Sequence, residues 1–469
     1  MPAPLPVKLR LALIAAAVTG AALAGGCKDF LKTTNPSAID PQSLSDSSFL
    51  SFMVNGAIGD FQAMYPVATY YNAVFTDELR NTHVFSEEVF YDRRDVDSLN
   101  GTFSVFVYTP MQRARWLADS VGGRIRVFEG DSANRDLRLA RAVAYAGYGL
   151  IALGEMECKA PVSTPDRLYS PALPPDSIFA MAIARFDTAI KVATDSRAAA
   201  VASPTAATAG TKAIIAGADS IKDLALVGAA RAALNMGNNT KALFYANQVQ
   251  PIPGTTDFQF RIYFNSNTSI SRLNNPMRDR LSTAPSTISG AMSGTPFEGI
   301  DDARVPYPRT STGTPQPEGT MNGLQLVVPN SPSSYSTFDG TKAGVDFDYG
   351  GWLRLASLLE AQYIIAEANG PTAQSIAFVE SRRLAFPSTT ATTPTDANNF
   401  MTNLIDQRRR DFYLDGHRIG DIRRYKKLYG IDLWQRGTVP GQTLPFSSRE
   451  CLPLNLAEYQ NNPAVRNQP

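Results

Sequence analysis

Pairs of alanine-rich segments with helical periodicity constrain the fold of this chain more than any other feature. Small and apolar residues recur every three or four positions in 135–157, and the same spacing returns in 175–194. A second pair covers 223–235 and 240–249, joined by the Met-Gly-Asn-Asn turn at 236–239. Small side chains let two helices approach closely, so each pair is expected to fold as a helical hairpin.

Further helices are expected on both sides of these pairs. The apolar spacing predicts two helices in 44–71, broken near Gly56–Gly59, and one helix in 108–128. Helices are also predicted at 352–369, 372–384, 400–414 and 418–429. Gly416 interrupts the last two, at a position that favours a residue able to take a positive φ.

Three stretches lack this periodicity. Residues 75–100 are mixed polar and aromatic and predict a long excursion, and 196–212 predicts a loose connection rich in Ala, Thr, Ser and Pro. Residues 251–350 are dominated by Pro, Gly, Ser, Thr and Asn but carry scattered aromatic residues. This stretch is too long for a plain connection and too aromatic for a disordered linker, so it is interpreted as ordered loops with a few short strands.

The hairpins resemble tetratricopeptide repeats, in which neighbouring units complete each other's core. Ala229, Ala230 and Ala233 before Gly237, followed by Ala242, show the resemblance. The predicted fold is therefore mostly α, with tetratricopeptide-like repeats in a superhelical scaffold, decorated by long loops and a few short strands. The repeats are placed at about 135–250 and 352–429, and the loop-rich insertion at about 251–350.

The N-terminus predicts export. Lys8 and Arg10 precede an apolar segment at 11–24 that is too short to span a bilayer, and small residues lead into Cys27. A cysteine at this place is typical of a bacterial lipoprotein, with lipidation at Cys27. We therefore expect a signal peptide at 1–26, a lipid-anchored tether at 27–43 and a single helical domain at 44–469.

Composition excludes several classes of function. The chain has 44 Lys and Arg against 43 Asp and Glu, so no basic excess is available to neutralise nucleic acid. His83 and His417 are the only histidines, and no ligand spacing suggests a metal site. No cofactor-binding or catalytic motif is found, so no enzyme is predicted. Cys158 and Cys451 either pair in an exported protein or remain buried thiols.

Several motifs, in their order along the chain, resemble the SusD/RagB-like outer-membrane nutrient-binding lipoproteins. The resemblance covers nearly the whole mature chain. Its segments are 27–31 at the mature N-terminus, the Asp302-x-Arg304 loop, the stretch 352–368, the charged run 408–424 and the Pro-rich end. Asp411 and Asp415 stand where the family pattern has glutamate.

This resemblance implies a lipoprotein on the outer face of the outer membrane. It implies that the protein binds an oligosaccharide or related nutrient and delivers it to a SusC-like TonB-dependent transporter. Lys28 and Asp29 are similar to the surface-export signal of such lipoproteins. Two alternatives stay open: a surface scaffold for protein assembly and, less favoured, a glycoside hydrolase using acid pairs such as Asp77/Glu78.

Loop aromatics with polar neighbours are the candidate ligand-binding residues, because flat rings stack on the C–H face of a sugar while polar groups bond its hydroxyls. The candidates are Asp77, Arg80, Asn81, Tyr91, Trp116, Tyr307, Tyr335 and Tyr349.

The charged run is interpreted as a structural ion-pair motif at a helix junction. Its members are Arg408, Asp411, Asp415, Arg418, Asp421 and Arg424. Spacings of three residues predict pairing of Arg408 with Asp411, and of Asp421 with both Arg418 and Arg424.

Overall fold

The structure is a computed structural model. It describes residues 46–81, 86–264, 275–277, 290–291, 294–298, 300, 302, 304–305, 320–321, 324–325, 352–386, 393–440 and 442–468. The chain divides into two compact units, Met1–Leu50 and Ser51–Pro469. The elements that position the functional residues belong to the second unit. The predicted signal peptide and tether, with Cys27, Lys28 and Asp29, lie outside the described residues.

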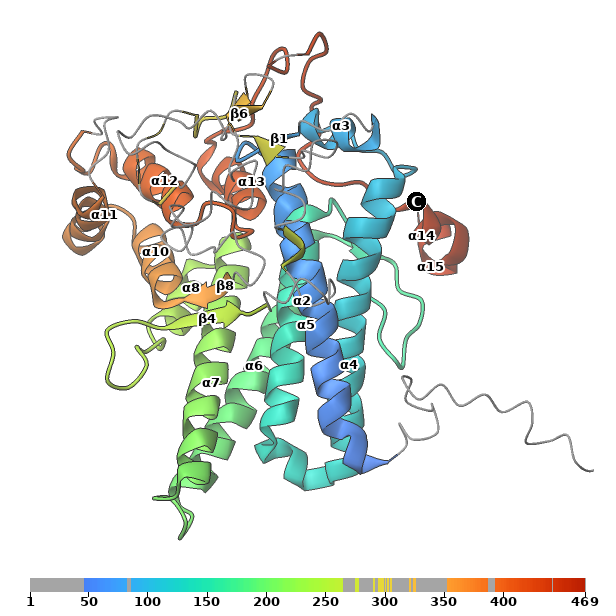
Figure 1. Ribbon diagram of the computed structural model, residues 1–469, viewed down its shortest axis with the longest axis vertical. Coiled ribbons are helices and arrows are strands. Elements are labelled where there is room, and N and C mark those ends of the chain that lie inside the picture. The colour runs from blue at the N-terminus through green and yellow to red at the C-terminus, as the bar shows by residue number, and fades with distance from the viewer. Residues whose placement is uncertain are drawn as a thin grey trace, which may run out of the picture. The chain divides into compact units, whose positions relative to one another are not determined.

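A row of helices forms the centre of the second unit (Figure 1). Each helix packs against the next one along the chain. The row consists of α4 (Thr109–Glu129), α5 (Leu137–Met156), α6 (Pro175–Val201), α7 (Ala209–Asn235) and α8 (Asn239–Ala246). The long helix α2 (Leu50–Phe75) lies against α5, where the rings of Phe61 and Tyr145 meet edge to face at 4.9 Å.

Glycine residues allow the central helices to pack closely. The ring of Phe186 on α6 lies between Gly147 on α5 and Gly228 on α7. A Cβ atom at Gly147 would stand 2.6 Å from Cε1 of this ring, which is closer than real carbon atoms approach. The small residues that mark these segments in the sequence therefore make room for one large aromatic side chain.

The C-terminal helices form a second group, in the upper left of Figure 1, that contacts the row through α8, α7 and α5. They are α10 (Leu358–Asn369), α11 (Ala373–Ala385), α12 (Phe400–Asp411) and α13 (Arg418–Tyr429). Ser357 caps α10, because its Oγ accepts a hydrogen bond of 3.1 Å from the backbone N–H of Glu360. Tyr363, Phe400, Leu404 and Phe412 form the core of this group.

The described strands form short antiparallel pairs. They are β1 (Arg80–Asn81) with β5 (Gly290–Ala291), β2 (Ala160–Pro161) with β3 (Ala172–Leu173), β4 (Gln259–Ile262) with β8 (Leu353–Ser357), and β6 (Thr320–Met321) with β7 (Leu324–Gln325). The remaining described helices are the 3₁₀ segments Ser47–Phe49 and Gly130–Arg135, α3 (Ser86–Asp92), the π-helix Phe103–Tyr108, α14 (Leu456–Asn461) and α15 (Pro463–Arg466). The predicted fold, mostly helical and tetratricopeptide-like with a few short strands, is confirmed.

Several predicted boundaries are wrong. Helix α2 runs without a break through Gly56 and Gly59, because both glycines face open space and no packing interrupts the helix there. The expected loose connection at 196–212 is mostly helical, since α6 continues to Val201 and α7 begins at Ala209. Alanine, a strong helix former, outweighs the scattered Ser and Thr in this segment.

Two C-terminal boundaries also differ from the prediction. The segment 352–369 begins as strand β8 before α10, because Leu353–Ser357 pairs with β4. Helix α12 ends at Asp411 rather than at 414, and Leu414 takes a positive φ of 58°. The Pro-rich C-terminal end contains the short helices α14 and α15.

A disulfide between Cys158 and Cys451 settles the question left open by the sequence. It joins the end of α5 to the C-terminal segment. Beside it, the backbone N–H of Leu452 donates to the carbonyl of Met156 at 2.8 Å. Among the described helices, none combines the length and the apolar character needed to cross a bilayer.

Candidate functional site

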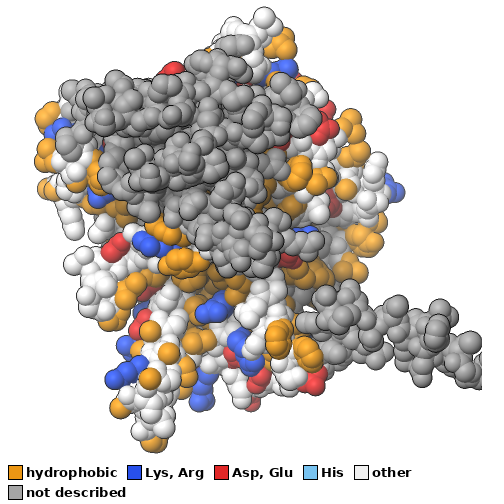
Figure 2. Space-filling view, viewed as in Figure 1, with side chains coloured by type: hydrophobic (Ala, Val, Ile, Leu, Met, Phe, Trp, Pro, Cys, Tyr) orange, Lys and Arg blue, Asp and Glu red, His pale blue; other side chains and the backbone are white. Residues whose placement is uncertain are grey.

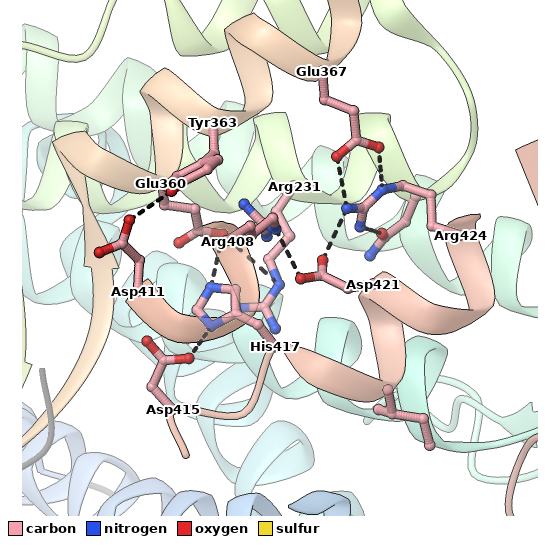
Figure 3. A network of polar contacts seen from close by, with 12 residues as sticks. Arg231, Glu360, Tyr363, Glu367, Arg408, Asp411, Asp415, His417, Asp421 and Arg424 are labelled. Carbon is pink, nitrogen blue, oxygen red and sulfur yellow. Dashed lines mark hydrogen bonds and ion pairs between the residues drawn. The ribbon is translucent and has the colours of Figure 1, made fainter. Parts of the chain in front are cut away.

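A buried network of charged side chains joins the two groups of helices (Figure 3). Its members come from segments far apart in the sequence. Helix α5 contributes Glu155, α7 contributes Arg231, α10 contributes Glu360 and Glu367, and the α12–α13 region contributes the charged run 408–424. A buried charge without a partner costs several kcal/mol, so each of these residues requires the others in place.

Asp421 is at the centre of one half of the network. Its carboxylate lies 2.8 Å from Arg408 Nε and 2.9 Å from Arg424 Nη2. Arg424 in turn pairs with both oxygens of Glu367, at 2.7 and 2.9 Å. Burial alone would raise the pKa of the Asp421 carboxyl, but Arg408 and Arg424 lower it below its usual value. The carboxylate is therefore charged and joins α13 to α12, while Arg424 joins α13 to Glu367 of α10.

His417 is at the centre of the other half of the network. Its Nδ1 lies 2.5 Å from Asp415 Oδ1, and its Nε2 lies 3.1 Å from Glu360 Oε1 (Figure 3). Burial and Arg231 lower the pKa of His417, but the two carboxylates raise it above the usual value of histidine. Arg231 pairs with Glu155 at 2.8 and 2.7 Å and also approaches Glu360 at 3.9 Å.

The partners within the charged run differ from the prediction. Asp421 and Arg424 are in contact, but Arg408 pairs with Asp421 instead of Asp411, and Arg418 pairs with Asp77 at 2.6 Å through both oxygens. Spacing along a helix describes exposed pairs, whereas these side chains point across interfaces between elements.

The Asp411 side chain forms hydrogen bonds with side chains of α10 and α11 rather than with Arg408. It accepts hydrogen bonds from Arg382 at 2.9 and 2.6 Å and from Tyr363 at 2.5 Å. Asp415 pairs with Arg354 of β8 at 2.9 Å as well as with His417. The predicted turn at Gly416 has φ +88°, and its carbonyl accepts from Asn72 Nδ2 at 2.9 Å. The network thus fixes the helix junction from all sides.

The described candidate ligand-binding residues do not form one exposed platform. Asp77, Arg80 and Tyr91 are buried, which corrects their placement in an exposed loop. Asp77 pairs with Arg418, Arg80 forms a bidentate pair with Asp92 at 2.6 and 2.7 Å, and Tyr91 packs on Tyr71. These side chains are buried because partners from other elements, charged for Asp77 and Arg80 and aromatic for Tyr91, stabilise them in the interior.

The remaining candidates are placed differently. Asn81 is half-buried in β1, and Trp116 is half-buried on α4. Tyr307, Tyr335 and Tyr349 lie outside the described residues. Trp352 precedes β8, and the guanidinium of Arg261 lies over its ring at 3.8 Å.

A cavity of about 510 Å³ lies along α12, and we call it the α12 cavity. Polar side chains form much of its wall: Thr393, Thr402, Asn403, Asp406, Arg409 and Arg418. Asp77 reaches its wall from the end of α2. Its size is that of ordinary small-molecule sites. A second cavity of about 420 Å³ lies between α5, α6 and α13, where Lys426 and Lys427 are paired with carboxylates.

Sequence reasoning missed the residues of the α12 cavity. Thr402, Asp406 and Arg409 are spaced by four and three positions, so they share one face of α12. This polar face is a signal that the sequence carries, but the neighbouring charged run obscures it. Within the described residues, no group of three or more His, Cys, Asp or Glu side chains is arranged to bind a metal ion.

Described charged side chains of both signs are interspersed on the face shown in Figure 2, together with apolar ones. No protein-family model matches the sequence, and no curated protein sequence is similar to it.

Solved structures do match. A SusD superfamily protein from Bacteroides thetaiotaomicron aligns with 90% of this chain and 99% of its own, with a TM-score of 0.61 and 13% identity. The fold is SusD-like. The prediction made from the motifs is thereby confirmed at the level of the fold.

Two other proteins with this SusD-like fold have names that mention a glycan. The surface glycan-binding protein A from Bacteroides thetaiotaomicron, in complex with laminarihexaose, aligns with 87% of this chain and 96% of its own, with a TM-score of 0.60 and 12% identity. A laminarin-binding SusD-like protein aligns with 89% of this chain and 98% of its own, with a TM-score of 0.55 and 12% identity. In this SusD-like fold the buried charged network joins the row α4 to α8 to the C-terminal helices α10 to α13.

Proposed function

We propose that this chain is a surface lipoprotein that binds a glycan and delivers it to a SusC-like TonB-dependent transporter. The observation that supports the proposal most is the match over nearly the full length of both chains to SusD-like proteins, two of which have names that mention laminarin or laminarihexaose. The polar α12 cavity adds a site of suitable size on this chain.

The proposed mechanism is binding without bond cleavage. Glycosidases need two free carboxyl groups that face the scissile bond. Of the acid pair Asp77/Glu78, both oxygens of Asp77 are held by Arg418, and Glu78 is buried and accepts the backbone N–H of Leu414 at 3.0 Å. Burial raises the pKa of Glu78 well above its usual value. Both groups serve the fold, so the pair lacks the freedom that acid–base catalysis requires.

The proposed location is the outer face of the outer membrane, with Cys27 carrying the lipid. Lys28 and Asp29 would act as the surface-export signal. The expected result for Cys27→Ala is loss of the protein from the outer-membrane fraction, measured by fractionation and by surface labelling of intact cells. Unchanged surface display of this variant would exclude the anchor.

A glycan array followed by calorimetry tests the binding function. Co-purification with a TonB-dependent receptor, which we expect to be encoded beside this gene, tests delivery. We expect binding to at least one oligosaccharide, with no shortening of the bound glycan after prolonged incubation. Tight binding to the receptor without any glycan binding would favour a scaffold instead. Release of shorter products would favour a glycoside hydrolase.

A further inference from the structure

We infer that the α12 cavity is a subsite for an uncharged sugar unit, held by hydrogen bonds to Arg409, Asn403 and Thr402. This inference rests on the proposed function and names the chemistry of its ligand. Three observations carry it: the fixed position of one guanidinium, the mixture of free donors and acceptors, and the balance of charge around the cavity.

The Arg409 guanidinium is held in place on two sides. Its Nε and Nη2 donate to Asp406 Oδ1 at 3.0 and 2.7 Å, and its Cζ lies over the ring of Phe297, 5.2 Å from the ring centroid. Within the described residues, Nη1 of Arg409 has no hydrogen-bond partner. A donor that is already fixed loses little entropy when it binds a ligand, so Arg409 is preorganised to donate to a hydroxyl oxygen.

Asn403 supplies an acceptor on the same wall. Its Nδ2 donates to the Thr393 carbonyl at 2.9 Å and to Thr395 Oγ1 at 3.0 Å, which fixes the orientation of the amide. Both amide hydrogens are thereby used, and the described part of the chain offers no donor to Oδ1. The exposed hydroxyl of Thr402 can donate and accept. Sugar hydroxyls also do both, so a wall that mixes donors and acceptors suits them.

The charges around the cavity cancel. Asp406 pairs with Arg409, and Asp77 pairs with Arg418 through two contacts of 2.6 Å. Each charged side chain of the wall therefore has its counter-charge beside it, and no excess positive charge attracts an anionic ligand. This arrangement favours a neutral pyranose over a uronic acid or a sulfated sugar.

The test compares variants of the full-length protein on a glycan array and by calorimetry with the neutral oligosaccharide that binds best. Laminarihexaose and hexagalacturonic acid are included as a neutral and an anionic probe of equal length. We expect Arg409→Gln to weaken binding about tenfold and Thr402→Val about threefold, as loss of a charged and of a neutral hydrogen bond predicts.

Matched controls separate the site from effects on stability. In Arg409→Gln, Asp406 keeps its pair with Arg410 at 3.0 Å. In the control Arg185→Gln, on α6, Asp119 likewise keeps a second arginine, Arg115, at 3.7 Å. Thr194→Val, an exposed threonine of α6, is the control for Thr402→Val. Both controls are expected to bind the glycan as the unaltered protein does.

The outcomes separate failure of the subsite from failure of the proposed function. Wild-type affinity in Arg409→Gln and Thr402→Val would overturn the subsite and leave glycan binding intact. Tighter binding of hexagalacturonic acid than of every neutral glycan would overturn the inferred sugar class. Absence of binding to any member of the array would overturn the proposed function together with the subsite.

Discussion

At the scale of single residues, His417 is expected to make stability depend on pH. Its pKa is raised in the folded chain, because Asp415 and Glu360 outweigh burial and Arg231. A raised pKa means that folding favours the protonated form. The contribution is fully present below about pH 6.5, the pKa of histidine in an unfolded chain, and is lost as the pH rises through the higher folded value.

His417→Gln should therefore lower the free energy of unfolding by about 3 kcal/mol at pH 6, as loss of one partner of a buried ion pair does. The difference from the unaltered protein should shrink toward pH 9. Urea unfolding at a series of pH values measures both. Lys191→Gln removes an exposed pair with Asp195 and is expected to change stability by less than about 0.5 kcal/mol at any pH. A constant difference for His417→Gln across this range would mean that His417 is neutral in the folded protein.

The charged run also shows how far single residues could be predicted. That Arg408 to Arg424 serve structure follows from their spacing and from the motif. Their partners do not, because Asp77, Glu367 and Glu360 stand 341, 57 and 57 positions away from Arg418, Arg424 and His417. Similarly, an aspartate such as Asp77 looks like a loop acid until the fold places an arginine beside it. Burial of a polar residue is decided by partners that local sequence does not contain.

At the scale of helices, glycines of different helices have opposite roles. A Cβ atom at Gly228 on α7 would overlap the ring of Phe186, whereas a Cβ atom at Gly59 on α2 would meet no atom within 4 Å. Gly228→Ala is therefore expected to destabilise the protein by about 2 kcal/mol through overpacking. Gly59→Ala should stabilise it by up to about 1 kcal/mol, because alanine is the better helix former.

Thermal or urea unfolding of the two variants provides the measurement, and each variant is the control for the other. Equal effects would show that helix propensity alone governs both sites.

The same contrast explains why the break predicted in α2 is wrong. A glycine marks either a break or a close contact, and only the neighbouring helix decides which. Hydrophobic periodicity predicted nearly every long helix. The residues at which the helices begin and end depend on contacts with distant segments, such as the strand pairing of β8 with β4.

At the scale of the whole molecule, the order of motifs along the chain predicted the SusD-like fold, although each motif is weak by itself. The position of the proposed ligand site could not be predicted in the same way. It depends on the wall that α12 forms with residues as distant as Asp77 and Pro296. The pairing of Cys158 with Cys451 was also left open, since two cysteines separated by 293 positions can be joined only by knowledge of the fold.

That disulfide leads to a prediction for the whole molecule. It closes a very long loop and holds the C-terminal segment, which carries α14 and α15, against the end of α5. The Cys158→Ser, Cys451→Ser double variant should lose about 4 kcal/mol of unfolding free energy, since the crosslink no longer restricts the unfolded chain. The backbone bonds of Leu452 to Met156 and Cys158 remain, so we expect a folded protein with a lower thermal midpoint.

Limited proteolysis then identifies the segment that becomes accessible to proteases when the disulfide is absent. Cleavage in the double variant should begin after Trp434, in the segment that the disulfide holds, while the row α4 to α7 stays intact. Dithiothreitol should produce the same pattern in the unaltered protein and no further change in the double variant. Because disulfides form in oxidising compartments, protein made without residues 1–26 in a reducing cytosol should behave like the double variant until it is oxidised. Equal stability and equal cleavage of the oxidised and reduced forms would show that the packing of the C-terminal segment alone holds it in place.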